Sequence, residues 1–396
     1  MHSDNPASVS ELFSSQLLLK PGFEDWLAIA EPDFRTSFAR SPVRHRFYRN
    51  GFEWDIHGTL YEPAQERLPG VGFALFHGGA GSEKEFETTP DGRPGLASIL
   101  AGLGFRCIAI TYPGHIPASG EWTESVTERQ PHYLLDQQLP LDEIIRRTEV
   151  CTYNTILAGS AELVDRTMAD HRLISFGHST GGPMSISLAE CLTRASIIGI
   201  VGWGSGGPDG WYREWVEFCA AKKDPVAPPN SMARRDVASF KRAGYEDAGD
   251  LCPWGGAEEY FVWADRFKSQ MKSGVCDNQH WAQAQALEET AKRCGLPAAE
   301  YLDHLRDPDP VWLARTGVLL LVGENDRNHW LLGDREDRKL EMFMGYKFKQ
   351  RARNAKVVLI PRYGHFGFAG LHNEKIAYYW VHALLHGFFD GVSYAD

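Results

Sequence analysis

Residues 172–186 constrain the fold more than any other stretch of this chain. A largely apolar run at 173–176 leads into Gly177-His-Ser-Thr-Gly181, and apolar residues at helical spacing follow. These flanks predict a buried strand, a sharp turn and a helix. Glycine at 177 and at 181 leaves room for a strained backbone at Ser179, as in a G-x-S-x-G elbow. We therefore predict that Ser179 lies at the tip of this turn.

The rest of the chain predicts a mostly parallel sheet flanked by helices, which is an α/β fold. An Asn-Gly pair within 44–61 is typical of a hairpin between two antiparallel strands that open the sheet. Strands and helices then alternate, as in parallel sheets. The further strands are expected at 71–76, 105–112, 197–203, 317–322 and 356–360, and the helices at 92–103, 144–169, 334–353 and 372–388.

The pattern divides the chain into three parts. Residues 1–42 carry an amphipathic pattern and predict an N-terminal helical extension. The main domain comprises 43–204 and 313–396. Between them, 205–312 contain no buried strand run and, with Trp203 at their threshold, hold seven of the twelve tryptophans. We interpret 205–312 as an inserted, mainly helical cap.

Charge and hydropathy exclude several classes of partner. The net charge is −11 and no basic run exceeds two residues, so neither nucleic acid nor an anionic membrane is expected. No stretch approaches the roughly 18 to 20 apolar residues of a membrane span. The N-terminus lacks the pattern of a signal peptide, and the seven cysteines form no C-x-x-C pair. We expect a cytoplasmic protein with reduced thiols.

A serine hydroxyl becomes a strong nucleophile only beside a base, and that base needs a third group to hold its tautomer. In such sheets, functional residues follow the carboxyl ends of strands. Asp326 follows one late strand in Val-Gly-Glu-Asn-Asp-Arg, and His365 follows the last in Arg-Tyr-Gly-His-Phe-Gly. The candidates therefore occur in the order Ser179, Asp326, His365.

Four motifs in this order resemble the α/β-hydrolase superfamily. They are His-Gly-Gly at 77–79, Gly-His-Ser-Thr-Gly at 177–181, Gly-Glu-Asn-Asp at 323–326 and Gly-His-Phe at 364–366. The resemblance covers residues from about 44 to 205 and from 316 to 390, and it does not extend to the cap.

The resemblance implies a role for each catalytic candidate. Ser179 would be the nucleophile, His365 the general base and then acid, and Asp326 the carboxylate that orients His365. The backbone amides of Thr180 and Gly79 would form the oxyanion hole, with Thr180 favoured by the dipole of the helix that it begins.

Two of these assignments have rivals. Glu324 and Asp209 are alternatives to Asp326 as the acid of the triad. The rivals of His365 lie in the last predicted helix, where a structural role is favoured: His372, His382 and His386. His77 is interpreted as a structural residue bonded near its turn, and His178 as the variable position of the elbow.

No metal or cofactor is expected. The sequence contains no H-E-x-x-H pattern, no paired Cys/His spacing, no P-loop and no dinucleotide fingerprint. Serine rather than aspartate at the elbow disfavours haloalkane and epoxide chemistry through an enzyme carboxylate.

The predicted activity is hydrolysis of a carboxylic ester, thioester or lactone through an acyl-enzyme. The cap aromatics favour a bulky apolar or aromatic substrate. Substrate contacts are expected from His77, Gly78, His178, Trp203, Trp211 and Trp215. C–C bond hydrolysis of a ketone or diketone and acyl transfer would use the same groups, and a ligand-binding protein without catalysis is a third hypothesis. The expected partner is a small-molecule substrate. The sequence leaves open whether the protein is a monomer or a homo-oligomer.

Overall fold

A computed structural model describes the sheet, most of its helices and the turn at Ser179. The described residues are 33–78, 82–89, 92–115, 133–151, 153–179, 181–205, 316–323, 355–360, 366–370 and 373–385. The N-terminal helices expected before residue 33, nearly all of the expected cap and the helix expected at 334–353 lie outside this part of the chain. Among the described residues, no helix is long and apolar enough to cross a membrane.

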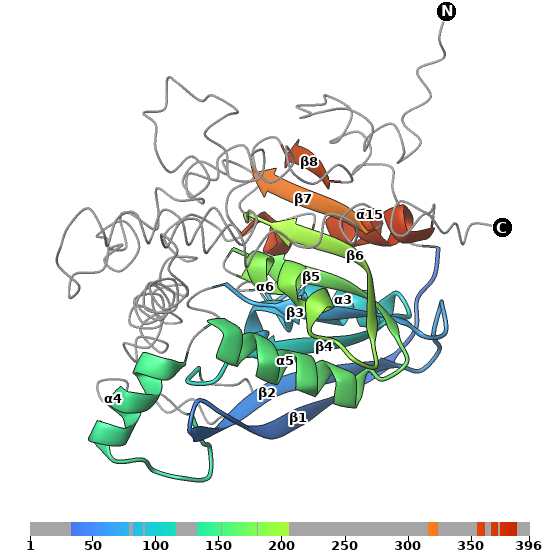
Figure 1. Cartoon of the computed structure of the whole chain (residues 1–396). Coiled ribbons are helices and arrows are strands. Elements are labelled where there is room, and N and C mark those ends of the chain that lie inside the picture. Colours follow the sequence, from blue (N-terminus) through green and yellow to red (C-terminus); the bar gives the residue numbers. More distant parts are fainter. Residues whose placement is uncertain are drawn as a thin grey trace, which may run out of the picture.

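Eight strands form one sheet in the order β1-β2-β4-β3-β5-β6-β7-β8 (Figure 1). Pairs β1–β2 and β2–β4 are antiparallel, and all others are parallel. The strands are β1 Phe38–Arg49, β2 Phe52–Pro63, β3 Val71–Phe76, β4 Arg106–Thr111, β5 Arg172–His178, β6 Ser196–Trp203, β7 Gly317–Gly323 and β8 Ala355–Ile360. The predicted α/β fold with a mostly parallel sheet is confirmed.

The predicted hairpin is formed by β1 and β2. Asn50 and Gly51 both have positive φ, 53° and 83°, as a two-residue turn between antiparallel strands requires. Arg49 pairs with Phe52 directly beside the turn. The strand β1 begins at Phe38, earlier than the expected start at residue 44.

Helices cover both faces of the sheet (Figure 1). Successive residues of β3 face opposite sides of the sheet, so Phe76 belongs to one buried cluster and Phe73 to the other. The first cluster includes residues of α5 Tyr153–Thr167 and α6 Gly181–Ser187, and the second includes residues of α3 Leu96–Gly102 and α15 Asn373–Leu385. The sheet is therefore buried on both faces.

One predicted helix, at 144–169, is wrong in its extent. The structure has two helices there, α4 Leu141–Val150 and α5 Tyr153–Thr167. The carbonyl of Val150 accepts hydrogen bonds from the side chains of Asn50 at 3.1 Å and Thr155 at 3.0 Å. These side-chain donors satisfy a carbonyl at the end of α4, where a helix lacks intrahelical partners.

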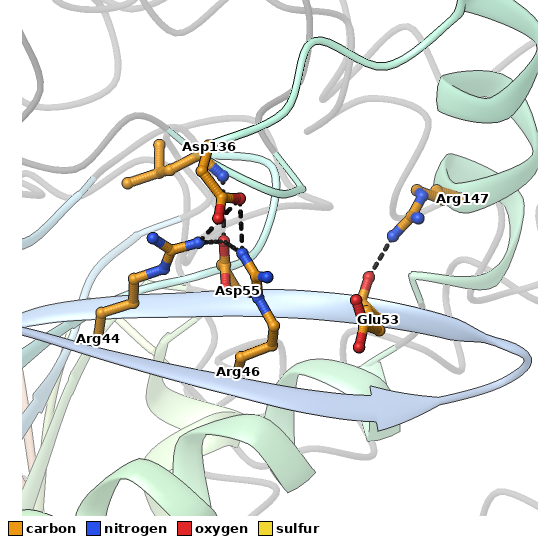
Figure 2. A network of polar contacts seen from close by, with 7 residues as sticks. Arg44, Arg46, Glu53, Asp55, Asp136 and Arg147 are labelled. Carbon is orange, nitrogen blue, oxygen red and sulfur yellow. Dashed lines mark hydrogen bonds and ion pairs between the residues drawn. The ribbon is translucent and has the colours of Figure 1, made fainter.

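A polar network fastens the segment at 133–136 to the hairpin (Figure 2). The buried carboxylate of Asp55 accepts hydrogen bonds from Arg44, from Arg46 at 3.0 Å and from the backbone amide of Leu135 at 3.0 Å. Asp136 pairs with Arg46 at 2.6 Å. Burial alone would raise the pKa of Asp55, but the hydrogen bonds from Arg46 and Arg44 outweigh it and lower the pKa. Asp55 is therefore ionised in the folded protein at neutral pH.

Arg147 adds a second attachment beside this network. It donates a hydrogen bond to the backbone carbonyl of Glu53 (Figure 2). Its guanidinium also lies 4.9 Å from the ring centroid of Phe52, within cation–π range. The helix α4 is thus held against the start of β2.

Candidate active site

Ser179 occupies the strained turn that the sequence predicts. It follows β5 directly and has φ 51°, in the left-handed region that side chains rarely adopt. Its amide donates to the carbonyl of Trp203 at 2.9 Å, and its carbonyl accepts from Gly182 at 3.0 Å. The turn therefore joins the end of β5 to the end of β6 and to the first residues of α6.

The two elbow glycines are required by close backbone contacts. A Cβ atom at Gly177 would lie 2.1 Å from the carbonyl oxygen of Gly181, and one at Gly181 would lie 2.3 Å from the carbonyl oxygen of Phe76. Real Cβ atoms do not approach other atoms this closely. The predicted need for glycine at both positions is confirmed, but the nearest contacts are with the backbones of Gly181 and Phe76 and not with that of Ser179.

The His77-Gly78 turn lies beside this serine, because Phe76 at the end of β3 pairs with Gly177 at the end of β5. His77 is fully buried, and this burial, with His115 as the next cause, lowers its pKa well below the usual value. Its Nδ1 lies 2.6 Å from the carbonyl oxygen of Gly78, and its Nε2 accepts from the amide of Tyr112 at 3.4 Å. A neutral ring that donates through Nδ1 fits both contacts, so His77 holds the turn.

Glu85 is the main residue near this site that the sequence reasoning missed. It lies in η1 Glu83–Phe86, a short turn that Ser82 caps. Its Oε2 accepts from the amide of Gly78 at 3.0 Å, and its Oε1 lies 2.6 Å from Nδ1 of His178. The run Glu-Lys-Glu at 83–85 is typical of a solvated surface, yet Glu83 and Glu85 are both buried. A serine three residues before Glu85, as in a capping motif, is a local signal that was available.

The structure assigns His178 a contact that the sequence interpretation did not include. Its ring is buried, pairs with Glu85, and lies 4.8 Å from the ring of Phe366 and 4.7 Å from that of Phe368. These two phenylalanines follow His365 in the sequence. The segment at 366–370 therefore begins next to the serine turn.

Arg93 fixes the far end of the same segment. It donates to the carbonyls of Ala369 at 3.1 Å and Gly370 at 2.9 Å, and to the side chain of Asn373 at 2.8 Å. Asn373 in turn donates to the carbonyl of Pro94 at 2.8 Å. The residues after His365 are thus attached both to His178 and to the loop before α3.

The remaining predicted residues divide into two groups. Ser179, His77, Gly78, His178 and Trp203 are described, and Trp203 is fully buried with its ring 6.4 Å from that of Phe368. Other candidates lie outside the described residues: Asp326, His365, Thr180, Gly79, Trp211, Trp215, Glu324 and Asp209. The strands β7 and β8 run parallel to β6 and β5, so their carboxyl ends lie on the same side of the sheet as that of β5, which Ser179 follows. Gly323 at the end of β7 and Ile360 at the end of β8 are the last described residues before the segments that contain Asp326 and His365.

Metal-ligating side chains do not gather anywhere in the described part of the chain. No group of three or more His, Cys, Asp or Glu residues there has a geometry that could hold a metal ion. Among the described cysteines, Cys107 and Cys151 are buried and Cys191 is partly buried.

The fold and the turn together define a class of protein. A mostly parallel sheet, covered by helices on both faces and with a strained serine after a central strand, is the α/β-hydrolase fold. The sequence matches the model of the alpha/beta hydrolase family over residues 73–377. The chain belongs to this family.

Comparison with solved structures finds distant similarities. A probable hydrolytic enzyme from Pseudomonas aeruginosa PAO1 has 18% identity and a TM-score of 0.46, over 89% of this chain and 95% of that chain. MenH from S. aureus has 13% identity and a TM-score of 0.47, over 84% and 97%. A bromoperoxidase from Bacillus anthracis has 15% identity and a TM-score of 0.44, over 87% and 98%. No curated protein sequence matches the chain significantly.

Proposed function

We propose that this protein is a serine hydrolase that cleaves a carboxylic ester, thioester or lactone through an acyl-enzyme. The observation that carries the proposal is Ser179, a non-glycine residue at φ 51° directly after a central strand. A serine in this conformation projects beyond the carboxyl end of the strand, where a substrate carbonyl has access to it. Strained residues of this kind cluster at functional sites.

In the proposed reaction, His365 takes the proton of Ser179 as the oxygen attacks the carbonyl carbon. The same histidine then protonates the leaving group, and water, activated by His365, releases the acyl group. Asp326 holds the imidazole in the required tautomer. The carboxylate of Glu85 already accepts a hydrogen bond from the amide of Gly78. This supports the next amide, that of Gly79, as the oxyanion donor that acts together with Thr180.

The substrate is proposed to be bulky and apolar or aromatic. Tryptophans gather in the sequence that follows β6, including Trp211 and Trp215. A lid that contains such residues would exclude water from an acyl pocket, which favours large acyl groups over acetyl.

The test uses Ser179→Ala and His365→Ala, with Ser175→Ala as the matched control in the buried middle of β5. A fluorophosphonate should label the wild type and Ser175→Ala but not Ser179→Ala. Turnover of p-nitrophenyl esters should fall by roughly 10⁴-fold or more in Ser179→Ala and His365→Ala, with little change in thermal stability. Retention of turnover by Ser179→Ala would refute the proposal.

The same assays separate the related reactions. Long and short acyl esters, lactones and β-diketones are compared, with and without an added alcohol or amine. Ester cleavage to the free acid supports hydrolysis, cleavage of the diketone indicates C–C bond hydrolysis, and a new ester or amide indicates acyl transfer. Equal activity on acetyl and long-chain esters would count against a bulky apolar substrate.

A further inference from the structure

Glu85 connects two loops through one buried carboxylate. The side chain of Glu85 is 7% exposed and that of its partner His178 is 2% exposed. One oxygen accepts from the Gly78 amide at 3.0 Å, and the other lies 2.6 Å from Nδ1 of His178. A His178 tautomer that carries its proton on Nδ1 donates to this oxygen. Both oxygens therefore have a donor where water is excluded.

Each partner of Glu85 directly precedes a residue with a proposed catalytic role. Gly78 precedes Gly79, the proposed oxyanion donor, and His178 precedes Ser179, the proposed nucleophile. We infer that Glu85 is a positioning residue, which fixes the oxyanion loop relative to the serine. This inference rests on the proposed function. It assigns no contact with substrate to Glu85.

The packing around His178 extends this connection to a third loop. The His178 ring contacts Phe366 and Phe368 with centroids 4.8 and 4.7 Å away. Phe366 directly follows His365 in the sequence. One imidazole that Glu85 orients thus touches the segment after the proposed base and precedes the nucleophile.

The contact between the two loops is also close. A Cβ atom at Gly78 would lie 3.0 Å from Nδ1 of His178 and 3.4 Å from Cβ of Ser179. Gly78 therefore packs directly against the His178 ring and the Cβ atom of Ser179. A carboxylate that holds both sides of this contact sets the orientation of the Gly78 amide relative to the serine turn.

The test measures the rate of fluorophosphonate labelling and kcat/KM in Glu85→Ala and Glu85→Gln. Alanine removes both hydrogen bonds, and misplacement of catalytic groups by about 1 Å typically costs about 100-fold in rate. Glutamine keeps an acceptor for the Gly78 amide and gives His178 a donor, which the other tautomer of its ring accepts. We expect a loss of about 100-fold for alanine and rescue to within about 10-fold of the wild type for glutamine.

Asp165 provides the matched control. It is a second buried carboxylate, and it accepts hydrogen bonds from the backbone amides of Thr193 at 2.7 Å, Arg194 at 3.0 Å and Ala195 at 2.9 Å. These residues precede β6, so they lie at the opposite end of that strand from Ser179. Asp165→Ala should lower the melting temperature and leave the labelling rate unchanged.

The outcomes distinguish the inference from the function on which it rests. If Glu85→Ala lowers the melting temperature as Asp165→Ala does, but is labelled within threefold of the wild-type rate, Glu85 is only structural and the inference fails. If Glu85→Ala does not fold, His178→Phe decides: it keeps the aromatic packing and loses the donor, and wild-type labelling would overturn the inference. A wild type that is not labelled at all would refute the proposed function together with the inference.

Discussion

The elbow glycine at 177 provides the sharpest test of how this site is built. In Gly177→Ala, the new methyl group would meet three backbone atoms of the following helix. It would lie 2.1 Å from the oxygen and 2.3 Å from the carbon of the Gly181 carbonyl, and 2.5 Å from the amide nitrogen of Gly182. Because these atoms are backbone, no side-chain rotation relieves the overlap.

The geometry sets the size of the expected effect. Ordinary contacts of a Cβ atom begin near 3.4 Å, so the end of β5 and the start of α6 must separate. A displacement of roughly 1 Å at a catalytic group typically lowers the rate by about 100-fold. Overpacking of this kind also lowers the free energy of unfolding by about 1–3 kcal/mol. We therefore expect Gly177→Ala to remain folded and to lose most of its activity.

The measurement combines urea unfolding, fluorophosphonate labelling of Ser179 and kcat/KM on an ester. The control is Gly102→Ala at the end of α3, where an added Cβ meets no atom within 4 Å. Alanine in a helix is favoured over glycine by about 0.5–1 kcal/mol, so this control should be slightly stabilised and fully active. Wild-type labelling and stability in Gly177→Ala would refute the reasoning, because the turn would then tolerate a side chain at 177.

Two further predictions concern charge and backbone strain. Asp55→Asn should lower the free energy of unfolding by about 1–3 kcal/mol at pH 7, because the donors Arg44, Arg46 and Leu135 lose a charged acceptor. Because folding lowers the pKa of Asp55 from its ordinary value of 3.8, ionised Asp55 stabilises the fold at pH values above 3.8. Urea titrations should therefore show the difference in stability between wild type and Asp55→Asn shrinking as the pH falls below 3.8. A constant difference down to pH 2 would contradict this prediction. Ser179→Gly should be about 0.5–1 kcal/mol more stable than Ser179→Ala, because glycine adopts φ 51° without strain, and equal melting temperatures would refute this.

Local sequence patterns were sufficient to predict most of the sheet. The hairpin follows from Asn50-Gly51, since these residues accept positive φ and so fix a two-residue turn. The buried strands are short apolar runs. Their alternation with helices along the chain predicts a parallel sheet, as observed. The strain at Ser179 follows from its two glycine neighbours at 177 and 181.

Long-range contacts explain what these patterns missed. The helix boundary at Val150 depends on the side chain of Asn50, which is 100 residues away in the sequence. The burial of Glu85 depends on His178, 93 residues away, and on the amide of Gly78. Periodicity and spacing describe neighbours along the chain, so they predict neither contact. The serine at 82 indicates only the local turn around Glu85, not the partners of its carboxylate.

The serine turn depends on two features, glycines that allow close backbone packing and hydrogen bonds that fix the orientation of the backbone. Because glycine has no side chain, the backbone at Gly177 can approach that of Gly181, and the backbone at Gly181 can approach that of Phe76. Hydrogen bonds fix the orientation of the turn. A strained φ costs of order 1–3 kcal/mol, and it persists only where the surrounding structure over-determines it. Here the amide of Ser179 is held by the carbonyl of Trp203, and the neighbouring ring of His178 by Glu85. The strained turn at the proposed nucleophile is therefore held from two separate elements, β6 through Trp203 and η1 through Glu85.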